Sequence, residues 1–276
     1  GKNLKSDEEI YSQYIDYQFR PYKNIYTTIG GRNDKHTTAG DEQSYRATTA
    51  FKLNGYSKVR ISYGTGFLFP ALYDGHNYGW SNADKDSINA EKTTSFDLGY
   101  ETYFDRLNLN FNITYFDIKI DDPIVGFNSM QQELLGGRNT SKGIELGTNW
   151  LPNKKITIGF NYTLTNSYSG MDCDKPNKDE WGYNSCVDSN NGVIDSAMVR
   201  VPLHALSSNI NYKFSNDFTT SLSFNYKGQT RDYGGTDEGF KDQILDEYLL
   251  IDLSSSYKLS NVYDLKFSFK NILDKS

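Results

Sequence analysis

The sequence predicts an all-β protein: a fragment of an antiparallel transmembrane β-barrel, with about twelve meandering strands that form an open, curved sheet. The clearest of three observations is the segment 93–120, where two alternating runs flank the break Asp105-Arg106. In the first run Phe96 and Leu98 share one parity, and in the second run apolar residues alternate with asparagine and threonine. A period of two is typical of a β-strand with one apolar face. The amide-rich opposite face indicates a water-filled lumen rather than the dry core of a soluble sandwich.

Composition is the second observation. Only 37% of the 276 residues are hydrophobic, and no stretch approaches the roughly 18 consecutive apolar residues that a membrane helix needs. A helical membrane protein is therefore excluded, whereas a barrel is not, because only alternate strand residues face lipid. The aromatic content of 15% suits strands with aromatic girdles at the membrane interfaces. No Pro-, Gly- or Ser-rich linker divides the chain, so we expect one domain.

The third observation is the alternation of short and long connections along the chain. Tight turns are expected near residues 21, 55, 105, 153, 216 and 261, and most connections between them are longer. Outer-membrane barrels have short turns at the periplasmic end and long loops outside. The pattern therefore favours this architecture over a soluble up-and-down barrel.

Alternation and turn residues together place the strands. They are expected at 8–20, 24–33, 43–53, 58–66, 93–104, 107–120, 131–151, 155–166, 199–214, 218–231, 247–259 and 265–273. Most of these predictions rest on alternating apolar residues, such as Ile15 and Tyr17 in the first strand. The turn Ser215-Asn216-Asp217 separates the strands 199–214 and 218–231. The segments 34–42, 67–92, 168–197 and 232–246 are expected to be loops.

The same alternation predicts which side chains share a face, because a slip of one residue would turn every apolar residue inward. The convex, lipid-facing surface is expected to hold Phe96, Leu98, Phe111, Ile113, Ile156, Phe160, Leu222, Phe224, Ile251 and Phe267. The concave, luminal surface is expected to hold Arg46, Arg60, Asp97, Asn110, Glu145, Asn161, Asn225 and Asp252. The first and last strands, 8–20 and 265–273, are expected to end far apart, each with an unpaired edge.

Charge and residue spacing argue against several function classes. The net charge of −6 argues against a nucleic-acid partner, which would need a basic footprint. The histidines His36, His76 and His204 lie far apart in the sequence, and no metal-binding or nucleotide-binding motif is present. We therefore expect neither an enzyme nor a bound cofactor.

Aromatic residues in the long loops are the candidate ligand-binding residues. They are Phe69, Tyr73, His76, Tyr78 and Trp80 in the loop 67–92, and Trp181 and Tyr183 in the loop 168–197. Exposed aromatic rings can stack on a rigid organic ligand. The alternative is that these rings pack among the loops or on one another.

The loop 168–197 also contains the two cysteines, Cys173 and Cys186. A disulfide between them in an oxidising exterior would stabilise the loop by roughly 3 kcal/mol through loss of unfolded-state entropy. A free pair of thiols is the alternative. In the same loop Asp188, Asn190 and Asp195 are candidate calcium ligands. Their spacing is one residue short of that of an EF-hand loop, so a solvated acidic turn is the alternative.

Four stretches resemble TonB-dependent outer-membrane receptors, the family of vitamin B12 and siderophore transporters. In the stretch 59–76, Phe67, Pro70 and Leu72 follow a glycine-punctuated strand as in that family. The stretch 89–101 is similar to another family motif, with Ala90 and Asp97 in place of the usual proline and glutamate. The stretch 136–150 has an asparagine ahead of Lys-Gly-Ile-Glu, and 269–276 resembles the Asn-Leu-Phe-Asp-Lys run of the penultimate barrel strand.

The resemblance implies that residues 1–276 are a partial C-terminal barrel domain. Family members combine an N-terminal plug domain with a barrel of about 22 strands, so the plug, the early strands and the last strand would be absent. The whole protein would lie in the outer membrane, bind a scarce nutrient and import it with energy from the TonB complex, which it contacts through the plug. Cobalamin, a ferric siderophore, haem and an oligosaccharide are all possible ligands.

Two other functions fit parts of the pattern. A passive outer-membrane porin would need neither plug nor partner, and the resemblance at 59–76 and 136–150 argues against it. A secreted soluble β-sheet binding module would be favoured only if the apolar faces packed on another sheet.

Overall fold

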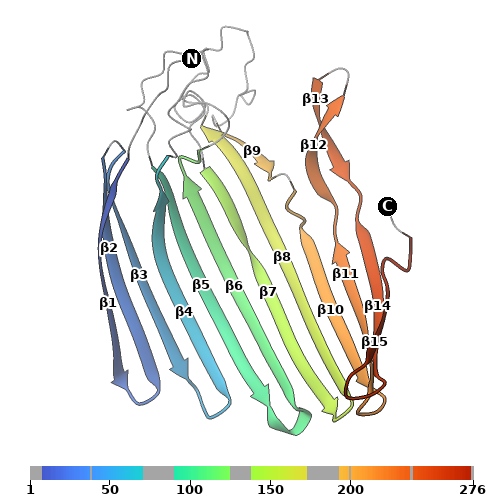
Figure 1. Ribbon diagram of the computed structural model, residues 1–276. Coiled ribbons are helices and arrows are strands. Elements are labelled where there is room, and N and C mark those ends of the chain that lie inside the picture. The colour runs from blue at the N-terminus through green and yellow to red at the C-terminus, as the bar shows by residue number, and fades with distance from the viewer. Residues whose placement is uncertain are drawn as a thin grey trace.

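The computed structural model describes residues 8–37, 39–70, 90–124, 138–172, 193–198, 200–236 and 239–274. They form one 13-stranded sheet and a separate two-stranded sheet. All strand pairings are antiparallel, and the large sheet follows the sequence order from strand to strand, except that β9 pairs with β8 to one side of this path. Figure 1 shows the strands side by side with a common tilt. The predicted all-β meander is confirmed.

The strands are long for a soluble sheet and of similar length across its centre. Those of the large sheet are β1 (Ile10–Tyr22), β2 (Ile25–His36), β3 (Gly40–Lys52), β4 (Ser57–Leu68), β5 (Glu91–Phe104), β6 (Leu109–Asp121), β7 (Arg138–Asn153), β8 (Ile156–Asp172), β9 (Val193–Ala197), β10 (His204–Lys213), β11 (Phe218–Lys227), β14 (Tyr248–Lys258) and β15 (Asp264–Phe269). The small sheet is the hairpin of β12 (Thr230–Thr236) and β13 (Gly239–Leu245).

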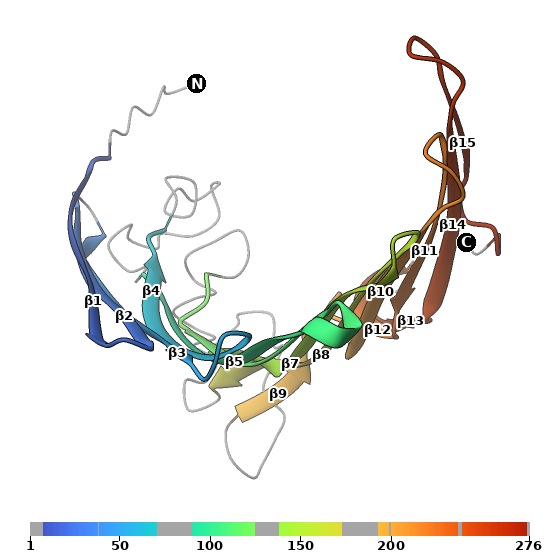
Figure 2. The ribbon, with the colours of Figure 1, turned by 90° about the horizontal axis from the view of Figure 1, so that it is seen from below.

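The large sheet is open and curved. Viewed from the turn end it forms a crescent with β1 and β15 at its two tips (Figure 2). Within the described ranges β1 pairs only with β2, and β15 pairs only with β14. The predicted open sheet with two unpaired edges is therefore confirmed.

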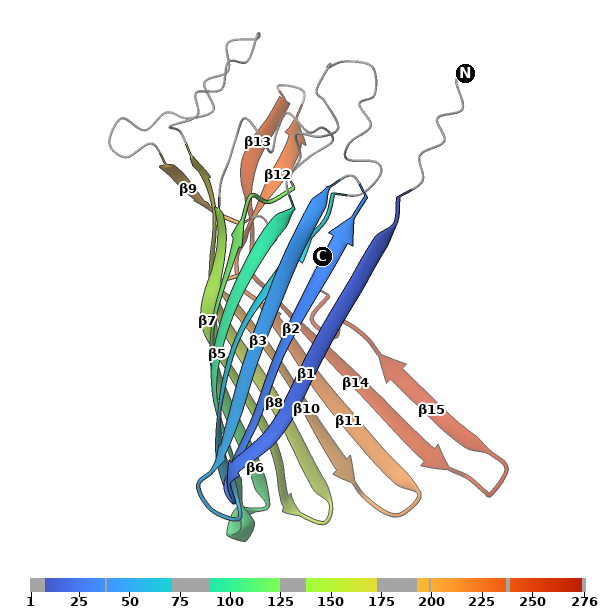
Figure 3. The same cartoon turned by 90° about the vertical axis from the view of Figure 1, so that its left-hand side faces the viewer.

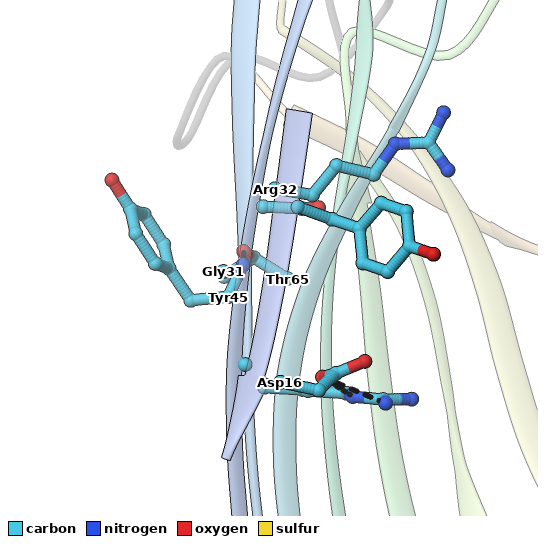
Figure 4. A pocket seen from close by; sticks show the side chains of 9 residues that line it. Asp16, Gly31, Arg32, Tyr45 and Thr65 are labelled. Carbon is cyan, nitrogen blue, oxygen red and sulfur yellow. Dashed lines mark hydrogen bonds and ion pairs between the residues drawn. The ribbon is translucent and has the colours of Figure 1, made fainter. Parts of the chain in front are cut away.

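The two faces of the sheet are as the alternation predicts. Directly opposed residues of an antiparallel ladder lie on the same face, and the register links Ile61 to Leu98 and Leu98 to Tyr115. Continued across every ladder, this rule puts the ten residues predicted to face outward on one side and the eight predicted to face inward on the other. We call these sides the outer face and the inner face. Around β2, Tyr45 lies on the convex outer side, whereas Asp16 and Arg32 project to the concave inner side (Figure 4).

Apart from the upper ends of β4 and β5, the outer face has no protein layer over it in the described part of the chain. Ala90 is the only buried hydrophobic residue there, whereas large outer side chains are exposed, such as Ile15 at 73% and Phe267 at 57%. A soluble sandwich would bury such residues against a second sheet. The condition that would favour a secreted soluble module is therefore not met by these residues.

Short turns gather at one end of the sheet, as predicted (Figure 3). Asparagine side chains close two of them: Asn54 Oδ1 accepts the backbone N–H of Ser57 at 2.8 Å, and Asn153 Oδ1 accepts that of Lys155 at 2.8 Å. Such Asx turns satisfy backbone donors that no strand partner reaches. At another short turn, the 3-10 helix η2 (Asp105–Leu107) joins β5 to β6. Among the described residues no helix is long and apolar enough to cross a membrane.

Three segments differ from the sequence prediction. The expected loop 34–42 is mostly strand, because β2 continues to His36 and β3 begins at Gly40. The expected loop 232–246 holds most of the β12–β13 hairpin, which stands above the sheet in Figure 3. The expected loop 168–197 begins with the end of β8 and contains β9. In the sequence of these segments, polar residues fall at both odd and even positions, so the period of two is lost.

Candidate functional site

The candidate site lies at the end of the sheet opposite the short turns, where β3 and β4 separate. Their pairing stops at Arg46 and Gly64, whereas the β2–β3 hairpin stays paired up to His36 and Gly40. β4 nevertheless continues along β5 to Leu68. The upper end of β4 is thus released from β3, and Figure 2 shows it inside the crescent.

Contacts across this separation show that the two layers overlap. The Phe69 ring lies 4.8 Å from the His36 ring and 5.1 Å from the Phe67 ring, measured between centroids. Lys92 Nζ lies 3.2 Å from Glu42 Oε1. Phe67 and Lys92 occupy outer-face positions of β4 and β5, whereas His36 and Glu42 occupy inner-face positions of β2 and β3. The β2–β3 hairpin therefore covers the outer side of the upper ends of β4 and β5.

The overlap buries two polar side chains, Asp34 at 1% and His36 at 6% exposure. The Asp34 carboxylate accepts two hydrogen bonds from Arg32, from Nε at 2.7 Å and from Nη2 at 2.9 Å. Arg32 Nη2 also donates to Ser12 Oγ at 3.1 Å. A two-pronged arginine–carboxylate contact is among the strongest pairings available to a buried charge. Asp34 is thus held in its charged form at a fixed place.

His36 is fixed by a backbone contact. The N–H of Ala39 donates to His36 Nδ1 at 3.0 Å, so Nδ1 carries no proton and the neutral ring has its hydrogen on Nε2. Nε2 faces Glu8 Oε2 at 3.6 Å. Across the ring, Phe69 provides an apolar contact. The ring is therefore held between the Glu8 carboxylate and the Phe69 ring.

A cavity of about 510 Å³ opens beside these groups, and we call it the mouth cavity. Its lining residues are Glu8, Ile10, Arg32, Asp34, His36, Phe67, Leu68, Phe69 and Pro70. Apolar walls with a few convergent polar groups are typical of small-molecule sites. The geometry suits a ligand with a flat apolar part and hydrogen-bonding groups.

A second cavity of about 330 Å³ lies lower on the same strands, at Gly30 and Gly31 (Figure 4). There Arg46 of β3 reaches across β2 to Asp16 of β1, with Nη2 2.8 Å from Oδ1. A Cβ atom on Gly30 would collide with Asp16 Oδ1 and lie 3.2 Å from Arg46 Nε. Glycine at position 30 therefore permits an ion pair that ties three strands together.

Of the predicted ligand-binding residues, Phe69 lies in the mouth cavity. Its contacts with His36 and Phe67 also agree with the alternative in which the aromatic residues pack on one another. The other candidates lie outside the described residues: Tyr73, His76, Tyr78, Trp80, Trp181 and Tyr183.

The disulfide and calcium predictions also fall outside the described residues. This holds for Cys173, Cys186, Asp188 and Asn190, and for the side chain of Asp195 in β9. Within the described ranges, no group of three or more potential metal-ligating residues is present. Both hypotheses stay predictions.

Sequence reasoning missed Arg32, Asp34 and His36 as site residues, because it expected a loop from residue 34. The signal that could have found them is their spacing, since the positions 32, 34 and 36 share one strand face. Two of them continue the inner face of β2 beyond the predicted strand end.

Comparison with known protein families identifies the family of this chain. The family model described as "TonB dependent receptor-like, beta-barrel" matches residues 2–272. The chain belongs to this family. TonB-dependent receptors lie in the outer membrane, and the open β-barrel sheet described above agrees with that place. The predicted resemblance to TonB-dependent receptors is thereby confirmed.

Solved structures of siderophore receptors and of an iron transporter share this fold at low sequence identity. The ferripyoverdine receptor of Pseudomonas aeruginosa has a TM-score of 0.71 at 15% identity, with 97% of this chain covering 35% of that one. The siderophore receptor PiuA of Acinetobacter baumannii has a TM-score of 0.70 at 22% identity, covering 97% and 39%. The iron transporter FrpB of Neisseria meningitidis has a TM-score of 0.71 at 14% identity, covering 97% and 41%. The chain therefore spans between a third and a half of these proteins.

No curated protein sequence matches the chain significantly.

Proposed function

We propose that residues 1–276 form the C-terminal part of the barrel of a receptor that imports a scarce nutrient with TonB-coupled energy. The observation that carries the proposal is the mouth cavity, which lies between the inner face of β1 and β2 and the upper end of β4 in a TonB-dependent receptor barrel sheet. Further strands on both edges and a plug domain would come from the rest of the protein. The plug would make the contact with the TonB complex.

The proposed ligand is a ferric siderophore. Solved structures with the same fold include receptors for such complexes. In the mouth cavity, the ring of Phe69 could stack on a flat iron-chelating group. Cobalamin, haem and an oligosaccharide are the competing ligand classes.

The same proposal assigns the other surfaces. Outer-membrane lipid would cover the exposed apolar outer face, since alternate residues of a barrel strand face lipid. The protein would be a transporter rather than an enzyme, with no cofactor. Its acidic net charge speaks against a nucleic-acid partner.

Uptake by the intact receptor tests this function. The whole protein is expressed in a bacterium that lacks its own siderophore receptors, and radioactive ferripyoverdine and ferric enterobactin are supplied with and without TonB. We expect accumulation of at least one complex only when TonB is present. Passage of small sugars independent of TonB would instead establish a passive porin.

The mouth cavity is tested by Phe69→Ala. Loss of one aromatic contact worth about 0.5–1.5 kcal/mol predicts roughly two- to thirteenfold weaker binding of the transported complex to intact cells. The matched control is Phe214→Ala at the turn end of the sheet, where the phenylalanine is 52% exposed. Equal affinities for the two variants would show that Phe69 does not contact the ligand.

A further inference from the structure

The inner face of the sheet divides into two parts that differ in charge. From β1 to β5 the ladder carries many charged inner side chains, which we call the charged half: Asp16, Arg32, Asp34, Glu42, Arg46, Lys52, Lys58, Arg60, Glu91, Asp97 and Glu101. From β6 to β11 the charged inner residues at described ladder positions are Glu145, Lys213 and Lys227.

Amides, hydroxyls and glycine dominate the second part. We call its central region the amide-hydroxyl wall; its residues are Asn149, Thr157, Gly159, Asn161, Thr163, Ser207, Asn209, Asn211, Ser221, Ser223 and Asn225. The nearby lysines Lys213 and Lys227 lie at opposite ends of the β10–β11 pair. The middle of the wall on β8, β10 and β11 is therefore uncharged.

Glycines keep this wall flat. A Cβ on Gly159 would collide with Asn209 Oδ1. Beside the wall, on β6 and β7, a Cβ on Gly147 would likewise lie 2.6 Å from Asn112 Nδ2. Each asparagine side chain thus lies over a glycine of the neighbouring strand instead of projecting into the lumen. Because glycine has no side chain, it allows this close approach.

Neutral hydrogen bonds within the wall occupy several of its polar groups. Asn161 Nδ2 donates to Ser207 Oγ at 3.5 Å, and Ser221 Oγ donates to Asn211 Oδ1 at 2.5 Å. Neutral hydrogen bonds are weaker than charge-assisted ones, and water replaces them at little net cost. A molecule that slides along such a surface meets no strong binding site.

The charged half has the opposite character. Lys58 Nζ lies 2.8 Å from Glu101 Oε2, and Arg46 is paired with Asp16. The side chains of Arg60 and Asp97, on the adjacent strands β4 and β5, have no hydrogen bond or ion pair with the described residues. Two charges of opposite sign on a luminal wall suit a partner with complementary charges, and such pairs hold two surfaces in register.

We propose that the imported ligand crosses the barrel along the amide-hydroxyl wall, while the plug domain stays docked on the charged half through Arg60 and Asp97. The inference rests on the proposed import function and adds the side of the lumen on which passage occurs. Separating a partner from the charged half would leave charges unpaired, whereas separating it from the amide-hydroxyl wall exchanges neutral hydrogen bonds for water. The plug therefore separates from the barrel wall first along β7 to β11.

A matched pair of cysteine variants tests the proposal in the intact receptor. Ser207→Cys lies on the amide-hydroxyl wall and Ser62→Cys on β4 of the charged half; both serines are half-buried, and each makes one side-chain hydrogen bond. All native cysteines are replaced by serine. Cells are treated with a membrane-impermeant, sulfonate-bearing methanethiosulfonate, with and without ferric enterobactin, or ferripyoverdine if that is the complex taken up.

The expected result is faster labelling of Ser207→Cys, by several-fold, when ligand and TonB are both present, with no change for Ser62→Cys. Labelled Ser207→Cys receptor should then lose uptake and regain it after reduction by dithiothreitol, which separates blockage from misfolding. Equal labelling, or faster labelling of Ser62→Cys, overturns the proposal. If the unlabelled receptor shows no TonB-dependent uptake, the proposed function fails and the proposal fails with it.

Discussion

Gly30 lies beneath the ion pair that joins Asp16 to Arg46, and its missing side chain leaves the room for that pair. For Gly30→Ala we predict a loss of about 1–3 kcal/mol in the free energy of unfolding, because overpacking forces the carboxylate aside. The ion pair itself contributes little, since its Arg46 side chain is 60% exposed. Denaturant unfolding of the purified whole receptor measures the difference.

Gly31→Ala is the matched control for this prediction. Its Cβ would project to the other face and meet the Tyr45 ring at 3.6 Å, an ordinary contact distance. It should change the stability by less than Gly30→Ala does. Combining Gly30→Ala with Asp16→Ala should recover part of the loss, and equal losses in all of these variants would disprove the steric explanation.

Each strand of the sheet separates an apolar outer face from a polar inner one, and Leu222 and Ser223 of β11 represent the two faces. Leu222→Arg should destabilise the folded barrel by about 2–4 kcal/mol, since it places a charge among lipid chains. Ser223→Arg should cost far less, because its side chain meets a wet lumen. Folding of the receptor into lipid vesicles at increasing urea concentrations measures both, and similar losses would contradict the lipid-facing assignment.

Alternation could predict the strands only where the two faces meet different surroundings. In β11 the pattern is clear, and the strand was placed correctly to within a few residues. In the upper part of β2, Asn33 and Lys35 on the outer face are as polar as Asp34 and His36 on the inner face. Without an apolar side no period of two remains, so the sequence prediction ended β2 too early.

The mouth cavity depends on contacts that no local pattern encodes. Its walls come from β1, β2 and β4, and it exists because β4 leaves β3 above Gly64 and packs Phe69 against His36. Only Phe69 was predicted, because an aromatic residue in a long loop suggests ligand stacking. The buried pair of Arg32 and Asp34 needed the register between strands.

Across the whole molecule, the free edges of β1 and β15 are the feature that the proposed architecture must explain. Each edge carries backbone N–H and C=O groups without a strand partner among the described residues. Such groups are costly in a bilayer, where no water can satisfy them. Barrel diameter grows with strand number, so a gently curved sheet suits a wide barrel to which other strands contribute.

The most direct test of this account is a cryo-electron microscopy map of the whole receptor in lipid nanodiscs, read at the free edges of β1 and β15. We predict that each edge pairs with a strand from outside residues 1–276, and that the mouth cavity opens into the lumen of the resulting wide barrel. A continuous ladder of hydrogen bonds from β1 to β15, closing a narrow barrel from these strands alone, would contradict it.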